Sequence, residues 1–310
     1  EPFRALVGDK VNENQRNAGY SIQSFLINVG AIIGSLLPFV LAKVGVQNVP
    51  DPGKTVAPSV IWSFYIGGTI LLLSVLFTAF TTKEYAPGTY EENSVREEVK
   101  PQKTNWKQII RDLPPVMLQL AFVQFFSWFA LFLMWVYTTP GVAQNVWNTL
   151  PTDSVSAAYN EAGNWVGVIF AVYSFFAALY ATFMARLANR FGRKTIYGLS
   201  LVAGGIGLLS MVFIHQPMGL IYSMIGVGIA WAAILAMPYA ILSASIPTDK
   251  MGVYMGIFNI TITVPQIAAG LLGGIILKLL CGKAIMMLGV AGISMLLAAV
   301  MVIRIKAKHE

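Results

Sequence analysis

The chain has 310 residues, of which 56% are hydrophobic and only 11% are charged, and its formal net charge is +7. Soluble domains carry about 25% charged residues, so this composition excludes an ordinary soluble protein. The basic residues lie in short stretches between apolar blocks, which argues against nucleic acid as a partner. One cysteine and two histidines provide neither a disulfide framework nor a metal cluster, and we expect no metal and no cofactor.

Eight apolar blocks reach the ~20 residues that a helix needs to cross a bilayer. They predict an all-α membrane protein with complete spans at 19–42, 57–80, 114–137, 164–187, 195–214, 218–245, 253–278 and 284–303. Residues 1–8 read as the last turns of a ninth span. Because the chain begins with Glu1 in the middle of that pattern, we expect it to be truncated at the N-terminus.

The charged stretch 81–112 is predicted to be a linker between two helical parts. Sixteen of the 21 Lys and Arg residues lie in the alternate loops that include this stretch and the C-terminus, and four lie in the other loops. The positive-inside rule therefore places the linker and the C-terminus in the cytoplasm. We predict the remainder of one helical half at 1–80, a cytoplasmic linker at 81–112, and a six-helix half at 113–310.

A short internal repeat relates the two predicted halves. The segment Pro2–Leu6 (PFRAL) is echoed by Pro238–Leu242 (PYAIL), and both segments end a span on the same predicted side. Parallel repeats of this kind are typical of transporters that bind their substrate between the halves. Glycines at small-residue spacing predict close helix packing or hinges; they include Gly30, Gly34, Gly270, Gly273 and Gly274.

The segment Ala185–Lys194 (ARLANRFGRK) resembles the cytoplasmic loop motif of the major facilitator superfamily. Arg190, Gly192 and Arg193 match motif positions, whereas Ala185 and Asn189 stand where the motif has Gly and Asp. The resemblance implies a major facilitator-type helical bundle of twelve spans, in which this loop follows the eighth. It also implies a role in the conformational change for these three residues and for Asp9.

Within that superfamily, the chain resembles the sucrose-transporter group of plants, animals and bacteria, which is related to the glycoside–pentoside–hexuronide symporters. The likeness rests on Pro2–Leu6 followed by Asp9, Ser127–Phe129 (SWF), Pro238–Ser243 (PYAILS), Gly256–Asn259 (GIFN) and Pro265–Gln266. It implies proton-driven uptake of sucrose or a maltose-like glucoside across a bacterial inner membrane. The plant members carry three charged residues where this chain has Leu133–Thr139 (LMWVYTT), so the roles of those charges are not carried over.

Proton coupling needs a titratable carboxylate near the substrate. None of the 14 acidic residues lies in the middle of a complete span, and Glu161, at the mouth of its span, is a weak substitute. In the resembled group the acid precedes Arg4 on the same helix, which implies that Arg4 pairs with an acid before residue 1 and helps to bind the sugar or to release the proton. Alternatively, the Arg4 side chain extends to the cytoplasmic surface near Asp9.

Polar side chains at membrane depth are candidate binding residues because they are costly there. Amides hydrogen-bond sugar hydroxyls, and aromatic faces cover sugar C–H groups. The candidates are Asn28, Gln124, Trp128, Asn259 and Gln266. Contacts between helices would explain the same residues, with Trp128 facing lipid, and we expect Trp135 to anchor its helix at the membrane interface.

These features predict a secondary active transporter that couples a proton to a di- or oligosaccharide by alternating access. We expect it to function as a monomer in the lipid bilayer and not as an enzyme. ATP-driven transport is not supported, because the sequence has no glycine-rich phosphate loop ending in Lys. Two alternatives remain open: a sodium- or other cation-coupled glycoside symporter, and a membrane sugar sensor that does not transport.

Overall fold

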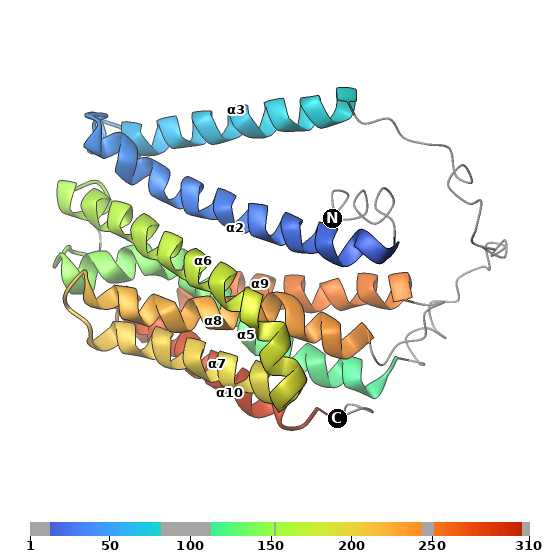
Figure 1. Ribbon diagram of the computed structural model, residues 1–310. Helices are drawn as coiled ribbons and strands as arrows, with labels where there is room; N and C mark the ends of the chain where they lie inside the picture. The colour runs from blue at the N-terminus through green and yellow to red at the C-terminus, as the bar shows by residue number, and fades with distance from the viewer. Residues whose placement is uncertain (1–12, 82–112, 152, 244–250, 306–310) are drawn as a thin grey trace.

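The computed structural model describes residues 13–81, 113–151, 153–243 and 251–305, and within them every regular element is helical (Figure 1). Eight of these helices are long and apolar enough to cross a membrane, which confirms the predicted all-α membrane fold. The expected ninth span at 1–8, the linker, Arg4 and Asp9 lie outside the described residues.

The helices match the predicted spans in number and order. They are α2 (Glu13–Lys43), α3 (Pro58–Thr81), α5 (Pro115–Val146), α6 (Ala157–Phe191), α7 (Arg193–Ser210), α8 (Gly219–Ser243), α9 (Met251–Leu279) and α10 (Ala284–Val302), with a 3₁₀ turn at Met211–Phe213. Each has the run of apolar residues that a bilayer requires, because an unpaired backbone group in hydrocarbon is costly and a helix pairs its own.

The predicted boundaries of α5 and α6 are wrong, because the polar stretch between them is mostly helical. α5 continues through Pro140 to Val146, and α6 begins at Ala157 with the Ser156 hydroxyl accepting from the Tyr159 N–H. The polar residues at the end of α5 make tertiary hydrogen bonds: Gln144 accepts from the Ala284 N–H at 2.8 Å, and Asn145 donates to the Ile214 carbonyl at 2.8 Å. A prediction from hydropathy alone assigns such polar helical turns to a loop.

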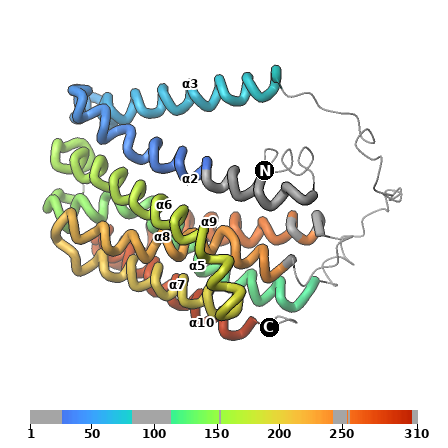
Figure 2. The backbone as a smooth tube through the Cα atoms, in the orientation of Figure 1, coloured from blue at the N-terminus to red at the C-terminus, as the bar shows by residue number. Residues whose placement is uncertain are grey.

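Helices α5 to α10 pack into one unit, with α5 against α10 and α9, α7 against α8 and α10, and α6 against α8. Helix α2 packs on the outside of α6, and α3 packs chiefly on α2 (Figure 2). The apolar side chains of α3 are consequently exposed along most of its length. The buried core therefore lies within the six-helix unit.

The bundle has two ends, because every helix runs along its length. One end carries Asn48 and the connections after α2, α5, α7 and α9, and we call it the Asn48 end (left in Figure 1). The opposite end carries Gly192 and the last residue of α8, and we call it the Gly192 end. Helices α2 and α6 lie close together toward the Asn48 end and separate toward the Gly192 end (Figure 1).

Glycines allow α7 and α8 to approach closely. A Cβ atom on Gly207 would overlap the Ser223 carbonyl oxygen, and one on Gly226 would overlap the Ala203 carbonyl oxygen. Small residues at such crossings allow backbones into van der Waals contact, which drives helix association in membranes. The glycines singled out from the sequence behave differently: Gly270 and Gly273 face aromatic rings of α5, whereas Gly30, Gly34 and Gly274 have nothing within 4 Å of an added Cβ in the described part of the chain.

We predict that Gly207→Leu lowers the free energy of unfolding by about 1–3 kcal/mol, because the side chain forces α7 and α8 apart. The measurement is thermal unfolding of the purified protein in detergent. Gly274→Leu is the matched control, since an added Cβ there meets no neighbour, and its melting temperature should stay level or rise. Equal losses in the two variants would contradict the packing role of Gly207.

Candidate functional site

Four aromatic side chains from three helices form a cluster inside the six-helix unit. The Trp231 ring of α8 lies 5.8 Å from Trp128 and 5.6 Å from Trp135, both on α5, and 6.5 Å from Tyr173 of α6. Its three contacts are all edge-to-face, the geometry that the aromatic quadrupole favours. We call these four residues the aromatic cluster; it brings α5, α6 and α8 to one place.

Two buried hydrogen-bond donors, one within this cluster and one a helical turn away from it on α5, have no partners among the described residues. Gln124 is fully buried and Trp128 is only 7% exposed. The Gln124 carbonyl oxygen accepts from the Tyr197 hydroxyl at 3.3 Å, but its amide nitrogen, like the Trp128 indole nitrogen, has no hydrogen-bond partner among the described residues. Buried donors are satisfied in the great majority of cases, so two unpaired ones a single helical turn apart mark a place where a ligand can accept.

The arrangement suits a ligand that presents both hydrogen-bond acceptors and apolar faces. The Gln124 amide and the Trp128 indole N–H supply donors, and the neighbouring rings supply flat apolar surfaces. Within the described residues no three His, Cys, Asp or Glu side chains come together, so the candidate site is built from amide, hydroxyl and aromatic groups.

The structure places the other predicted residues apart from this pair. Asn259 of α9 is half-buried and accepts from the Tyr239 hydroxyl of α8 at 3.1 Å. Gln266, two turns further along α9, is also half-buried, as is Asn28 on α2. Both amides of α9 are therefore in partial contact with protein, but the hydrogen bond of Asn259 leads to α8 and not to Gln124.

One interpretation of the tryptophans on α5 is wrong. Trp128 does not face lipid, since its side chain is buried against Trp231. Trp135, expected as an anchor at the membrane interface, packs its ring into the aromatic cluster. Their spacing of seven residues places both on one face of α5, and that face is directed into the unit.

Sequence reasoning missed two contributors, Trp231 and Tyr197. Trp231 stands alone among Ala, Gly and Ile residues on α8, where an indole surrounded by small residues was the available signal. Tyr197 is fully buried on α7, only four residues after Arg193. Nothing in the sequence around Tyr197 points to its partner, because the hydrogen bond to Gln124 joins residues 73 positions apart.

The predicted loop motif forms the turn between α6 and α7. Gly192 has φ +87°, a conformation that side chains with a Cβ rarely adopt, and it allows α7 to begin immediately after α6 ends. The Arg193 guanidinium donates to the Ala240 carbonyl at 2.9 Å, in the last turn of α8, where helix carbonyls lack intrahelical partners. Arg190 is exposed and lies 5.3 Å from the Phe191 ring. The turn thus ties α7 to the end of α8.

Eight membrane-length helices around a buried polar and aromatic cluster define a multi-pass integral membrane protein. The family model of the Major Facilitator Superfamily matches residues 2–146 and 139–310, and the chain belongs to this superfamily. It is therefore a membrane transporter with a small-molecule substrate. No curated protein matches the chain significantly.

We predict that Gln124→Met changes the free energy of unfolding by less than about 1 kcal/mol, because the bond from Tyr197 is lost while an unpaired buried donor, costly by itself, is removed. Leu120→Ala, one turn away and equally buried, should lose about 2–5 kcal/mol through cavity formation. Thermal unfolding in detergent compares the two variants. If Gln124→Met is as destabilising as Leu120→Ala, the amide serves the fold and not a ligand.

Proposed function

We propose that this transporter is a secondary active symporter that couples proton entry to uptake of a di- or oligosaccharide, such as sucrose or a maltose-like glucoside. The observation that carries the proposal is the pair of unpartnered buried donors, Gln124 and Trp128, beside the aromatic cluster. Sugar hydroxyl oxygens accept hydrogen bonds, and the C–H faces of pyranose rings stack on indoles. The resemblance to the sucrose-transporter group supports the same substrate class.

The packing of α2 on α6 supports alternating access as the mechanism. A Cβ atom on Gly167 of α6 would overlap the Ser35 carbonyl oxygen of α2, so the two backbones are in close contact near the Asn48 end. The helices separate toward the Gly192 end (Figure 1). We propose that the Gly192 end faces the cytoplasm of a bacterial cell, with the basic loops, and that rocking of 1–80 against 113–310 opens each end in turn.

Proton coupling is proposed from the resemblance, with Arg4 as the residue that pairs with the coupling acid. Asn28, Asn259 and Gln266 remain proposed sugar contacts, and Asp9, Arg190, Gly192 and Arg193 remain proposed participants in the conformational change. Helix α2 would carry Asn28 toward the site as the halves move. The protein is proposed to act as a monomer.

Labelled sugar uptake tests this proposal directly. The complete gene is expressed in cells that lack sucrose and maltose uptake, and accumulation is followed over a panel of sugars with and without a protonophore. We expect accumulation of at least one disaccharide that collapses with the proton gradient. Uptake that depends on sodium and is unaffected by the protonophore would identify sodium as the coupling ion. Saturable sugar binding without accumulation would indicate a sensor.

We predict that Gln124→Met lowers kcat/KM for sugar uptake by about 10- to 100-fold, which corresponds to the loss of one or two hydrogen bonds to the substrate. Trp128→Leu should have a comparable effect, because it removes both a donor and a ring. Gln216→Met, which changes an exposed amide in the connection before α8, is the control. Unchanged uptake in the first two variants, at equal expression, would show that the sugar binds elsewhere.

A further inference from the structure

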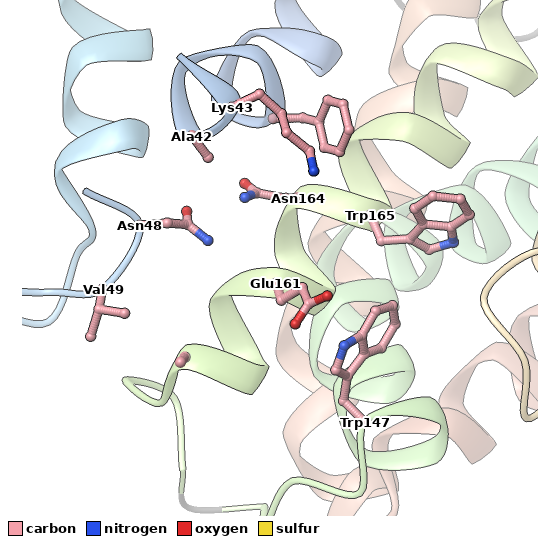
Figure 3. Close-up of a pocket in the computed structure, with 10 residues that line it drawn as sticks. Ala42, Lys43, Asn48, Val49, Trp147, Glu161, Asn164 and Trp165 are labelled. Atoms are coloured by element: carbon pink, nitrogen blue, oxygen red, sulfur yellow. The ribbon is translucent and has the colours of Figure 1, made fainter. Parts of the chain in front are cut away.

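A pocket lies at the Asn48 end, well away from the aromatic cluster along α6. It has a volume of about 380 Å³, within the range of small-molecule sites. One wall comes from α2 and the connection that follows it, and the other comes from the end of α5 and the first turns of α6 (Figure 3). Its charged, amide and indole lining residues are Lys43, Asn48, Trp147, Glu161, Asn164 and Trp165.

The two amide side chains that line this pocket, Asn48 and Asn164, have hydrogen-bonding groups without partners among the described residues. Ser59 donates to the Asn48 carbonyl oxygen at 2.8 Å, which leaves the Asn48 amide nitrogen directed toward the pocket (Figure 3). Asn164 is only 9% exposed, and its side chain makes no hydrogen bond to any other described residue. The Asn164 amide is therefore available to hydrogen-bond a ligand or water in the pocket.

The charged side chains face the same space from opposite walls. The Lys43 ammonium lies 5.7 Å from the Phe39 ring centre and the Glu161 carboxylate lies across from it, and these two form no ion pair (Figure 3). Asp51, in the connection after α2, is different, because its carboxylate pairs with Lys54 at 2.8 Å. That hydrogen bond, together with the opposite charge, raises the pKa of the Lys54 ammonium.

The two indoles provide flat apolar walls in fixed positions. The Trp165 indole N–H donates to the Pro217 carbonyl at 2.9 Å, which ties its ring to the connection before α8. Trp147 follows the last residue of α5; both indoles are half-buried, and the Trp147 ring lies beside Glu161 (Figure 3). Indole faces next to carboxylate and amide groups suit the mixed apolar and hydroxyl surface of a sugar.

The charge pattern selects a neutral ligand. Glu161 opposes an anion and Lys43 opposes a cation, whereas neighbouring sugar hydroxyls can donate to the carboxylate and accept from the ammonium at once. Hydrogen bonds to charged groups are the stronger ones. Together with the indole faces and the proposed substrate class, this pattern favours a neutral saccharide as the occupant.

The pocket exists only while the two walls are together. Lys43 and Asn48 belong to the α2 side, and Glu161 and Asn164 belong to the α5–α6 side. The close contact between Ser35 of α2 and Gly167 of α6 holds these sides together. It lies about one helical turn from the pocket, on the side toward the middle of the bundle. A ligand that touches both walls binds this arrangement and not one in which α2 and α6 have separated.

We infer that the pocket at the Asn48 end is a second, lower-affinity saccharide site whose occupancy holds that end closed. The inference rests on the proposed function, because it uses the same class of ligand and the same rocking motion. A ligand shifts an equilibrium toward the state that it binds better. High sugar concentrations at the Asn48 end therefore slow the return of the transporter to the state that is open at that end.

The test measures initial uptake rates of the accumulated sugar over a wide concentration range in cells that express the complete protein. We expect the rate to rise, pass through a maximum and fall. Glu161→Ala should weaken the inhibitory phase by about tenfold, as expected for losing one hydrogen bond to a charged group, and Trp147→Leu should weaken it as well. Asp51→Ala, which removes a nearby carboxylate outside the pocket lining, should keep the wild-type curve.

Sugar titration of the purified protein, followed by tryptophan fluorescence, gives a readout without transport. We expect two binding phases. Glu161→Ala should lower the sugar affinity of the low-affinity phase, and Gln124→Met should lower that of the high-affinity phase. Uptake that saturates without a decline, together with a single phase insensitive to Glu161→Ala, would overturn the second site and leave the symporter proposal intact. If cells accumulate no sugar but the titration still shows a binding phase that Glu161→Ala weakens, the symporter proposal is overturned and the second saccharide site is supported.

Discussion

The need to pair every polar group away from water governs this protein. Hydrocarbon offers no hydrogen bonds, so the backbone forms helices that pair their own N–H and C=O groups, and polar side chains inside the bundle bond to backbone or to one another. Ser294 donates to the Phe126 carbonyl, and Arg193 donates to the end of α8. Against this pattern, the amide nitrogen of Gln124, the indole N–H of Trp128 and the hydroxyl of Thr149 are the exceptions among the described residues, and the first two are the basis of the proposed ligand site.

The same constraint explains why the site is assembled by several helices. Gln124 lies on α5, its partner Tyr197 on α7, and the ring of Trp231 on α8. No single helix can surround a ligand, because its side chains project outward from its axis. Close packing of α7 on α8 through Gly207 and Gly226 brings these helices together. Packing at glycines and binding at aromatic and amide groups are therefore parts of one arrangement.

In the proposed mechanism, the contact between α2 and α6 links the candidate site to movement. Close backbone contact at Gly167 and Ser35 lies toward the Asn48 end, whereas the helices separate at the other end (Figure 1). A transporter whose two halves rock against each other needs contacts that form in one conformational state and are absent in the other. The pocket formed by Lys43, Glu161 and their neighbours has this property, since its walls belong to the two sides of that contact.

The sequence by itself determined the solvent, the helical class and the eight membrane-length helices, because a run of about 20 apolar residues has few alternatives to crossing a bilayer. The loop motif also identified the superfamily before the fold was known. Only the tertiary structure decided that α5 extends to Val146, because the polar side chains of Gln144 and Asn145 form hydrogen bonds with residues far away in the sequence. Likewise, only the fold joined Gln124 to Tyr197 and Trp128 to Trp231. Hydropathy reports what each residue prefers as surroundings, but the identity of its neighbours depends on how the helices pack.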